Sequence, residues 1–450
     1  MKRLYVETYG CQMNVKDSEH IIGELSDCYL SVEKPEDADL IIINTCSVRE
    51  KPVQKLFSRL GQLKKINPNA RFGVCGCTAS HMGEEIRRKA PFVSFILGAR
   101  NISRIREVVE QEGVVITDLN YDDTTYVYKN SRKYWFKDFV NIMVGCDKRC
   151  TFCIVPKTRG RELSIPMELI LRQVEQLAEE GVKEITLLGQ NVNNYGKRFS
   201  ISHPKVDFTD LLREVSQIDG IEWIRFASPH PLHADDRFLE EFATNPKICK
   251  HIHFPLQSGS NKILKLMKRG YTQQWFLDRI RLIRQIPDVA ISTDIIVGFP
   301  GEKEEDFEET LKVVEKVRFE QIYSFLYSPR PLTDALYYPN RVPSTIGKKR
   351  LYRLQALQRQ ILEEIGKEKI GKIYRVLMES RESGRSENFF SVKLTEVPEH
   401  FDREGVVGTF LQVEIVESNL HTLYGRPILT GERVGKGEKN KKPTNKKEKL

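Results

Sequence analysis

Three closely spaced cysteines are the residues of this chain that point most directly to chemistry. Cys146, Cys150 and Cys153 stand in the run GCDKRCTFC, with the spacing C-x3-C-x2-C. Three thiolates are one fewer than the four that normally close an iron–sulfur cluster or a structural zinc site. A 4Fe-4S cluster held by three thiolates keeps one iron open to a ligand from outside the protein.

Two other uses of close cysteines fit the sequence less well. A zinc knuckle needs a fourth Cys or His at ligand spacing, and the next histidine along the chain is His203. A disulfide framework is disfavoured because nine cysteines, an odd number, are spread over 450 residues and no signal peptide is recognised before them. The motif therefore predicts a cluster whose open iron binds S-adenosylmethionine, and hence an enzyme that generates radicals.

A second set of cysteines emerges when the strands that precede them are considered. Cys11, Cys46 and Cys77 each follow a predicted strand. Because the carboxyl ends of parallel strands meet at one edge of a sheet, we expect these thiols to converge and to hold a second 4Fe-4S cluster with an open iron. Cys75 competes with Cys77, but it lies inside its strand. Buried core cysteines are the alternative interpretation.

The first ~120 residues alternate strands with helices, which predicts an α/β fold built on a doubly wound parallel sheet. The segment DLIIINT is a continuous apolar run, as expected of a buried parallel strand. The expected strands are 4–10, 39–45, 70–77 and 93–98, and the expected helices are 18–28, 48–66, 82–89 and 102–110.

Residues 137–330 repeat the strand–helix pattern about six times, which predicts a partial (βα)6 barrel, too short to close as an eight-fold barrel does. A long basic helix over 345–369 follows. Short strand runs with glycine turns over 372–429 then predict a small antiparallel β barrel.

S-adenosylmethionine is expected across the carboxyl ends of the central barrel strands. Asp294, flanked by Ile and Val, needs a partner if it is buried, and Arg225 on the third barrel strand is a candidate. Each of these polar residues could instead belong to the core or to an ordinary turn. The candidate cofactor-binding residues are Gln190, Asn191, Gln257, Ser258, Thr293, Asp294 and Gly298.

Positive charge is concentrated around the first cysteine motif. From Lys129 to Arg161 there are nine Lys or Arg and two Asp, a net charge of +7 within the +9 of the whole chain. Basic residues mixed with aromatic residues suit an RNA loop, because phosphates attract cations and unstacked bases stack on flat rings. Phe136 and Phe139 could equally be core residues. The aromatic residues are Tyr126, Tyr128, Tyr134, Trp135, Phe136 and Phe139.

The two cysteine sets together resemble the methylthiotransferase branch of the radical S-adenosylmethionine superfamily, over roughly residues 1–430. Within that branch the similarity is to the tRNA-modifying enzymes. Val144, Lys157 and Leu332 depart from the usual family pattern, but none of them is a predicted ligand. The segments that carry the resemblance are YGCQMNVKDSE, NTCSVREK, CTFCIVPKTRGRE, LLGQNVNNYG, QSGS, RGYT and STDIIVGFPGE.

The resemblance implies that the two clusters take part in different steps of the reaction. The first cluster and S-adenosylmethionine give a 5′-deoxyadenosyl radical, which takes hydrogen from C2 of an isopentenylated adenosine next to the anticodon. The second cluster presents sulfur methylated by another S-adenosylmethionine, so two are used per turnover. No residue is expected to act as a side-chain acid or base. The implied partners are tRNA and an electron donor such as a flavodoxin or ferredoxin.

The resemblance also implies three domains. They are an N-terminal methylthiotransferase domain (1–118), a radical S-adenosylmethionine core (132–363) and a TRAM-like barrel that helps to hold tRNA (366–430). A basic tail (434–450) is expected to be disordered, because its lysine-rich run has no apolar residue between Val434 and Leu450 to pack. RNA contacts are expected from Arg381, Arg385 and Arg426 of the barrel and from Lys348, Lys349, Arg350, Arg353 and Arg359 of the helix before it.

No apolar run is long enough to span a bilayer, so we expect a cytoplasmic protein without membrane contact, and a monomer. Three alternatives remain open. Two apply the same chemistry to another modified adenosine or to a ribosomal protein, and the third is a non-catalytic iron–sulfur protein that binds RNA or transfers electrons.

Overall fold

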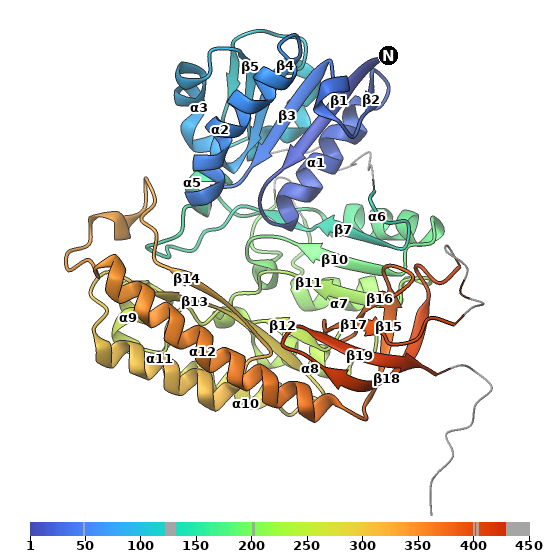
Figure 1. The fold of residues 1–450 in the computed structure, drawn as a ribbon, viewed down its shortest axis with the longest axis vertical. Coiled ribbons are helices and arrows are strands. Elements are labelled where there is room, and N and C mark those ends of the chain that lie inside the picture. Colours follow the sequence, from blue (N-terminus) through green and yellow to red (C-terminus); the bar gives the residue numbers. More distant parts are fainter. Residues whose placement is uncertain (48–49, 122–131, 200–202, 399–400, 402–404, 429–450) are drawn as a thin grey trace, which may run out of the picture.

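The computed structural model describes residues 1–450 except 48–49, 122–131, 200–202, 399–400, 402–404 and 429–450. The predicted basic tail and Tyr126 and Tyr128 lie outside the described residues. The described chain forms an N-terminal α/β domain, an α/β core and a C-terminal β barrel, in this order along the chain (Figure 1). None of the described helices is long and apolar enough to cross a membrane.

The N-terminal domain is built on a six-stranded sheet in which every pair of neighbouring strands is parallel. The order is β2-β1-β3-β4-β5-β6. The four predicted strands are present, and the sequence analysis missed the three-residue strands β2 and β6. The bounds are β1 Lys2–Thr8, β2 Tyr29–Ser31, β3 Leu40–Thr45, β4 Arg71–Gly76, β5 Val93–Gly98 and β6 Val114–Ile116.

Helices cover both faces of this sheet, so it is doubly wound as predicted. The side chains of strand β3 point alternately to the two faces. Ile41 and Ile43 pack with α2 and α3 on one face. Leu40 and Ile42 pack with α1 and α4 on the other face. Two helices begin earlier than expected, at Gln12 rather than 18 and at Cys77 rather than 82. The helices are α1 Gln12–Leu25, α2 Glu50–Ile66, α3 Cys77–Lys89 and α4 Ile105–Val108, with 3-10 turns η1 Pro35–Asp37 and η2 Ala99–Arg104.

The core contains six parallel strands that form the predicted partial barrel. They pair as β11-β10-β7 and β12-β13-β14, and a parallel bridge between Ile224 and Ile248 lies just before β12. The strands are β7 Lys137–Asn141, β10 Glu184–Leu188, β11 Trp223–Phe226, β12 His251–His253, β13 Ala290–Val297 and β14 Gln321–Leu326, and a small ribbon pairs β8 Met143–Val144 with β9 Leu163–Ser164.

A helix follows each of the first five barrel strands, and the large apolar cluster of the core lies between helices and strands. The helices are α5 Val155–Thr158, α6 Met167–Glu179, α7 Phe208–Gln217, α8 Asp236–Thr244, α9 Asn261–Leu266, α10 Gln273–Ile283, α11 Glu304–Val317 and α12 Ser344–Lys369, with 3-10 turns η3 Val192–Asn194, η4 Pro231–His233 and η5 Asp334–Tyr337.

The C-terminal domain is a closed five-stranded barrel in the order β15-β16-β17-β19-β18. Its pairs are antiparallel, as predicted, with the exception of β17 and β19, which run parallel. Strand β16 was not predicted from the sequence. The strands are β15 Ile373–Met378, β16 Ser383–Ser386, β17 Ser391–Leu394, β18 Phe410–Ser418 and β19 Thr422–Pro427.

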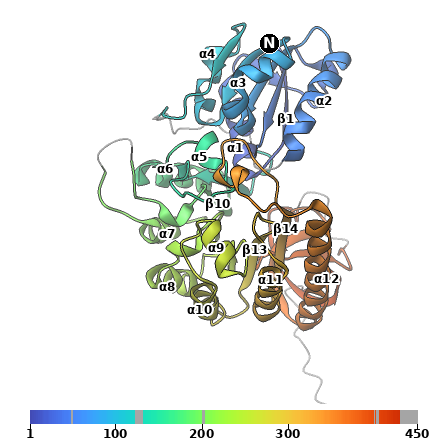
Figure 2. The same ribbon diagram turned by 90° about the vertical axis from the view of Figure 1, so that its left-hand side faces the viewer.

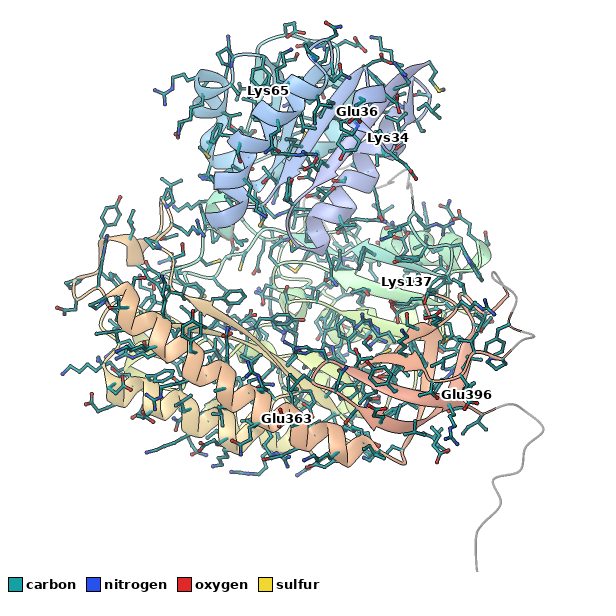
Figure 3. All side chains as sticks on the ribbon, viewed as in Figure 1. Lys34, Glu36, Lys65, Lys137, Glu363 and Glu396 are labelled. Carbon is teal, nitrogen blue, oxygen red and sulfur yellow. The ribbon has the colours of Figure 1, made fainter. Side chains whose placement is uncertain are left out.

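Buried contacts fix this small barrel to the core. Arg225 on β11 donates hydrogen bonds to the backbone carbonyls of Ser386 and Glu387, each at 2.9 Å. The ring of Phe389 stacks on His251 of β12, with 4.8 Å between ring centroids. Lys137 of β7, labelled in Figure 3, forms an ion pair with Glu379 of the barrel at 2.6 Å.

The N-terminal domain lies over the core, and the carboxyl ends of its strands point toward it (Figure 1, Figure 2). Lys16 of α1 is completely buried and lies 2.8 Å from the carboxylate of Asp138 in β7. Helices α3 and α5 also touch where the two units meet. This stacking brings the edge that carries the second cysteine set close to the first cysteine motif.

Candidate active site

The structure brings Cys11, Cys46 and Cys77 to the carboxyl ends of three adjacent strands, β1, β3 and β4. Cys11 precedes the first turn of α1, and Cys77 is the first residue of α3. Gly10 has φ +141°, and a Cβ atom there would come within 2.8 Å of the Cβ of Cys46. Only a glycine at position 10 lets the backbone beside Cys11 pass so close to Cys46.

Arg159, which follows α5 in the α/β core, contacts this second cysteine set. The guanidinium of Arg159 is fully buried, and its Nε lies 3.3 Å from the sulfur of Cys77. The other end of the guanidinium donates a hydrogen bond to Asp17 of α1 at 2.6 Å. Burial raises the pKa of the Asp17 carboxyl, and the attraction of Arg159 opposes this shift. Arg159 therefore belongs to the second cysteine set in space, although it follows the first motif in sequence.

The first cysteine motif occupies the loop between β8 and α5. Cys146 is buried, with Cys150 and Cys153 half-buried beside it. The backbone N–H of Cys153 donates to the carbonyl of Cys150 at 3.1 Å, which makes a turn between them, and the two thiols interact electrostatically. Burial raises the pKa of Cys146 and of Cys153 to about 12, and the charge of Cys150 contributes to both shifts.

Arg269, which follows α9, gives the first motif the same kind of contact. Its Nη1 lies 3.4 Å from the sulfur of Cys150. The guanidinium is held by the carbonyl of Pro255 at 2.9 Å and by the hydroxyl of Tyr271 at 3.0 Å. An N–H donor beside a sulfur favours the thiolate, which is the form that binds iron.

Both cysteine sets have the donor chemistry that a 4Fe-4S cluster requires. Within the described ranges, no three Cys, His, Asp or Glu side chains converge as a single metal ion would demand. A 4Fe-4S cluster is larger than a single metal ion, and three thiolates bind it at three separate corners. Near Cys46 and Cys77 the hydroxyls of Thr45, Ser47 and Thr78 are buried and have no partner in the described chain. Such groups are rare in folded proteins, and here they fit a group that accepts hydrogen bonds.

The predicted cofactor residues Gln190 and Asn191 lie at the end of β10, beside the first motif. The Gln190 side chain accepts a hydrogen bond from the backbone of Gly145, the residue before Cys146. Asn191 is buried and donates to Glu162 at 2.7 Å. The Nε2 of Gln190 and the Oδ1 of Asn191 are buried without a partner among the described residues, so both remain available to a ligand.

Three other predicted residues hold the strand ends in place. Thr293 is fully buried and bridges the backbone of Phe254 and Leu256, at 2.8 and 2.9 Å. Gln257 has a left-handed backbone, with φ +74°. Ser258 accepts the backbone N–H of Ser260 at 3.2 Å. Their observed contacts make them supports of the candidate site.

The expected pairing of Asp294 with Arg225 is wrong. Asp294 lies 3.3 Å from Nε2 of His253 on the neighbouring strand β12. Arg225 instead pairs with Glu184 of β10 at 2.8 Å. Strand β12 separates β11 from β13, so Arg225 and Asp294 are not neighbours in the barrel.

The last predicted residue, Gly298, has φ +73° and donates its backbone N–H to Glu302 at 2.6 Å. Glu302 is buried and also accepts from Arg350 of α12 at 2.8 Å. Arg350 is therefore a structural residue, and the expectation that it contacts RNA is wrong. Phe136 is likewise a core residue, since it is fully buried beside the C-terminal barrel.

Sequence reasoning missed Asp17, Arg159 and Arg269. All three lie in segments already recognised as motifs, YGCQMNVKDSE, CTFCIVPKTRGRE and RGYT. A charged residue within a recognised motif is a usable signal. The contacts of Arg159 with Cys77 and Asp17, however, become visible only when the two domains are stacked, and that of Arg269 with Cys150 only when the core is folded.

Comparisons with known proteins show which family this chain belongs to. The model of the Radical SAM superfamily matches residues 140–314, and that of the uncharacterized protein family UPF0004 matches residues 3–98. Over 443 residues the chain is 57% identical to the tRNA-2-methylthio-N(6)-dimethylallyladenosine synthase of a Nitratiruptor species, covering 96% of this chain and 100% of the relative. The enzyme of the same name from Wolinella succinogenes is 53% identical, covering 95% and 100%.

Among solved structures, the radical S-adenosylmethionine methyltransferase TsrM from Kitasatospora setae is similar, with a TM-score of 0.53. The alignment covers 75% of each chain at 12% identity, which supports the fold alone.

Proposed function

Because this chain belongs to the radical S-adenosylmethionine tRNA methylthiotransferase family, we propose that it methylthiolates C2 of N6-isopentenyladenosine next to the anticodon of tRNA. The observation that carries this conclusion is the 57% identity to a tRNA-2-methylthio-N(6)-dimethylallyladenosine synthase across 96% of the chain. The alternatives on a ribosomal protein, on another adenosine or without catalysis are not favoured by these relatives.

A radical S-adenosylmethionine domain implies one 4Fe-4S cluster and S-adenosylmethionine. We assign this cluster to Cys146, Cys150 and Cys153, and we propose a second 4Fe-4S cluster at Cys11, Cys46 and Cys77. Two S-adenosylmethionine molecules per turnover are part of the same proposal. When bound, the first cluster and its S-adenosylmethionine supply the radical that removes hydrogen from C2, while the second supplies sulfur.

The protein's own residues position these groups. Gly145, whose N–H is held by Gln190, sets the entry of the first motif at the end of β10. Arg159 and Asp17 tie the second cysteine set to the core, which brings it near the first motif. No side chain is assigned a proton-transfer role, because an unactivated C–H bond is not broken by acid–base chemistry.

The activity is tested in a strain that lacks this chain. Bulk tRNA is digested and analysed by mass spectrometry, and we expect 2-methylthio-N6-isopentenyladenosine to be absent and its unmethylthiolated precursor to accumulate. Re-expression of the wild-type chain should restore the modified nucleoside, whereas the Cys150→Ala variant should not. Persistence of the nucleoside in the deleted strain contradicts the proposal.

The two-cluster assignment is tested by iron analysis after anaerobic reconstitution. Two clusters correspond to about eight irons per chain, and replacement of Cys11, Cys46 and Cys77 by Ala should leave about half. This variant should still cleave S-adenosylmethionine to 5′-deoxyadenosine but should insert no sulfur. Loss of both activities would make the second cysteine set structural.

The remaining partners are proposals of the same kind. tRNA is the substrate named for the relatives. We propose a flavodoxin or ferredoxin as electron donor, a monomeric cytoplasmic enzyme, and the predicted domain bounds 1–118, 132–363 and 366–430. The proposed RNA contacts are Arg381, Arg385 and Arg426 on the C-terminal barrel and Lys348, Lys349, Arg353 and Arg359 on α12, all of them exposed except the partly buried Arg385.

A further inference from the structure

Each cysteine set receives one buried arginine. Arg159 Nε lies 3.3 Å from the sulfur of Cys77, and Arg269 Nη1 lies 3.4 Å from the sulfur of Cys150. The two arginines are only 3% and 5% exposed. A buried guanidinium keeps its charge, and water screens that charge far less than it would at the surface.

The two arginines differ in their other partners. Arg159 donates to the carboxylate of Asp17 at 2.6 Å, so this pair carries no net charge. Arg269 is held by a backbone carbonyl and the hydroxyl of Tyr271, which are both neutral. In the described part of the chain, no ion pair links Arg269 to a carboxylate.

Two further charges act on the first cysteine motif. Lys148 interacts with both Cys146 and Cys150, and Glu162 interacts with Cys146. These two charges oppose each other, and the Glu162 carboxylate is engaged by the amides of Asn191 and Asn194. Among the described charged groups that interact with the cysteine sulfurs, Arg269 therefore has no carboxylate partner, whereas Asp17 offsets Arg159.

We propose that Arg269 directs one-electron reduction to the cluster that binds S-adenosylmethionine, and that the Arg159–Asp17 pair leaves the second cluster oxidised. The inference rests on the two clusters of the proposed function. The electron comes from a low-potential one-electron donor, which is oxidised by one electron, and the transfer itself makes or breaks no bond. Reduction adds one negative charge to a cluster, and a nearby uncompensated cation stabilises that charge.

Reduction of the first cluster in preference to the second favours the reaction. An electron that settles on the second cluster is not available to cleave S-adenosylmethionine. Arg159 still donates to Cys77 and orients it, but its charge is already balanced by Asp17. Arg159 and Arg269 are positioning residues, which act through the thiolates that they contact.

The test measures the midpoint potential of each cluster separately in full-length protein. One chain carries Cys11, Cys46 and Cys77 as Ala and keeps only the first cluster, and a second chain carries Cys146, Cys150 and Cys153 as Ala and keeps only the second cluster. Redox titration followed by electron paramagnetic resonance gives each potential. The substitutions Arg269→Gln and Arg269→Lys are made in the first chain, and Asp17→Asn in the second.

We expect Arg269→Gln to lower the ratio of reduced to oxidised first cluster about tenfold at the original midpoint, a shift of about 59 mV for one electron. Arg269→Lys, which keeps the charge, should recover most of this ratio. Asp17→Asn should shift the second cluster in the opposite direction, to a higher potential, because Arg159 becomes uncompensated.

The direction of each shift in midpoint potential tests the inference. If Arg269→Gln and Arg269→Lys shift the potential equally, the charge of Arg269 is not the cause and the inference fails. It also fails if Asp17→Asn leaves the second potential unchanged or lowers it. Should Arg269→Gln not take up iron, the Asp17→Asn result decides alone. Absence of any cluster in the second chain would instead contradict the two-cluster proposal.

Discussion

Lys16 and its neighbours form a buried charged group where α1 meets β7. The amine is completely buried, 2.8 Å from Asp138 and 3.5 Å from Glu19. Burial raises the pKa of Glu19 to about 7, the attraction of Lys16 opposes the shift, and the charge of Asp138 adds to it. One cation thus faces two carboxylates at the junction of two domains.

This group predicts a pH dependence of stability. The pKa of Glu19 is higher in the folded chain, about 7, than the ordinary value of 4.5. Its stabilising effect is therefore complete below about pH 4.5 and is lost as the pH rises through 7. We expect the free energy of unfolding to fall by about 2–3 kcal/mol between pH 5 and pH 8 because of this residue.

The measurement is urea unfolding of the cluster-loaded chain at both pH values, followed by tryptophan fluorescence. Glu19→Gln keeps the shape of the side chain and removes its titration, so this variant should show a flatter pH profile. Identical profiles for both proteins would contradict the assignment.

Residue identities were predictable where chemistry restricts the choice of residue. Cys11, Cys46 and Cys77 were placed together because each follows a strand, and the structure brings all three to one edge of the sheet. The partner of Asp294 was not predictable, because His253 and Arg225 both belong to barrel strands. Only the order of the strands determines which one lies beside Asp294.

At the scale of elements, the loop that carries the first cysteine motif depends on one glycine. Gly145 has φ +78°, and a Cβ atom there would clash with the backbone carbonyl of Arg161. We expect Gly145→Ala to strain this loop and to leave about half of the iron after reconstitution, as the second cluster would still load. Iron and sulfide analysis provides the measurement.

Gly61 in α2 is the matched control, because a Cβ atom there meets nothing within 4 Å and the backbone is helical. Gly61→Ala should retain all the iron and stabilise the chain by about 0.5–1 kcal/mol. Full iron content in Gly145→Ala would show that the loop tolerates the added carbon.

Long elements followed from the sequence, whereas several short ones, such as β2, β6 and β16, did not. The run DLIIINT predicted β3, and the long helix expected over 345–369 matches α12 Ser344–Lys369. Strands of three or four residues, such as β2 and β16, are too short for a periodic signal and form because neighbouring strands offer free hydrogen bonds. Helix α3 starts at Cys77 and kinks at Gly83, which explains why only its second part was predicted.

At the scale of the whole molecule, Arg225 links the core to the C-terminal barrel. It is buried, pairs with Glu184 and holds two carbonyls of the barrel. We expect Arg225→Ala to lower the free energy of unfolding by about 3–5 kcal/mol, because Glu184 is left buried and unpaired. Denaturant unfolding gives this energy, and limited proteolysis should release the C-terminal barrel.

Arg353→Ala is the control for this prediction. Arg353 pairs with Glu304 and Glu308 but is about half exposed, with 47% of its side chain accessible. Its loss should therefore cost about 1 kcal/mol or less. Equal effects of the two substitutions would mean that Arg225 does not join the domains.

The insertion of Phe389 beneath the core strands has a consequence for how a nucleic acid is received. The ring of Phe389 stacks on His251 and Arg225 holds the adjoining carbonyls, so contacts on several groups fix the small barrel to the core at this junction. The proposed RNA contacts Arg381 and Arg426 on this barrel therefore have a defined position relative to the core. A tRNA that binds them as proposed meets a preformed surface.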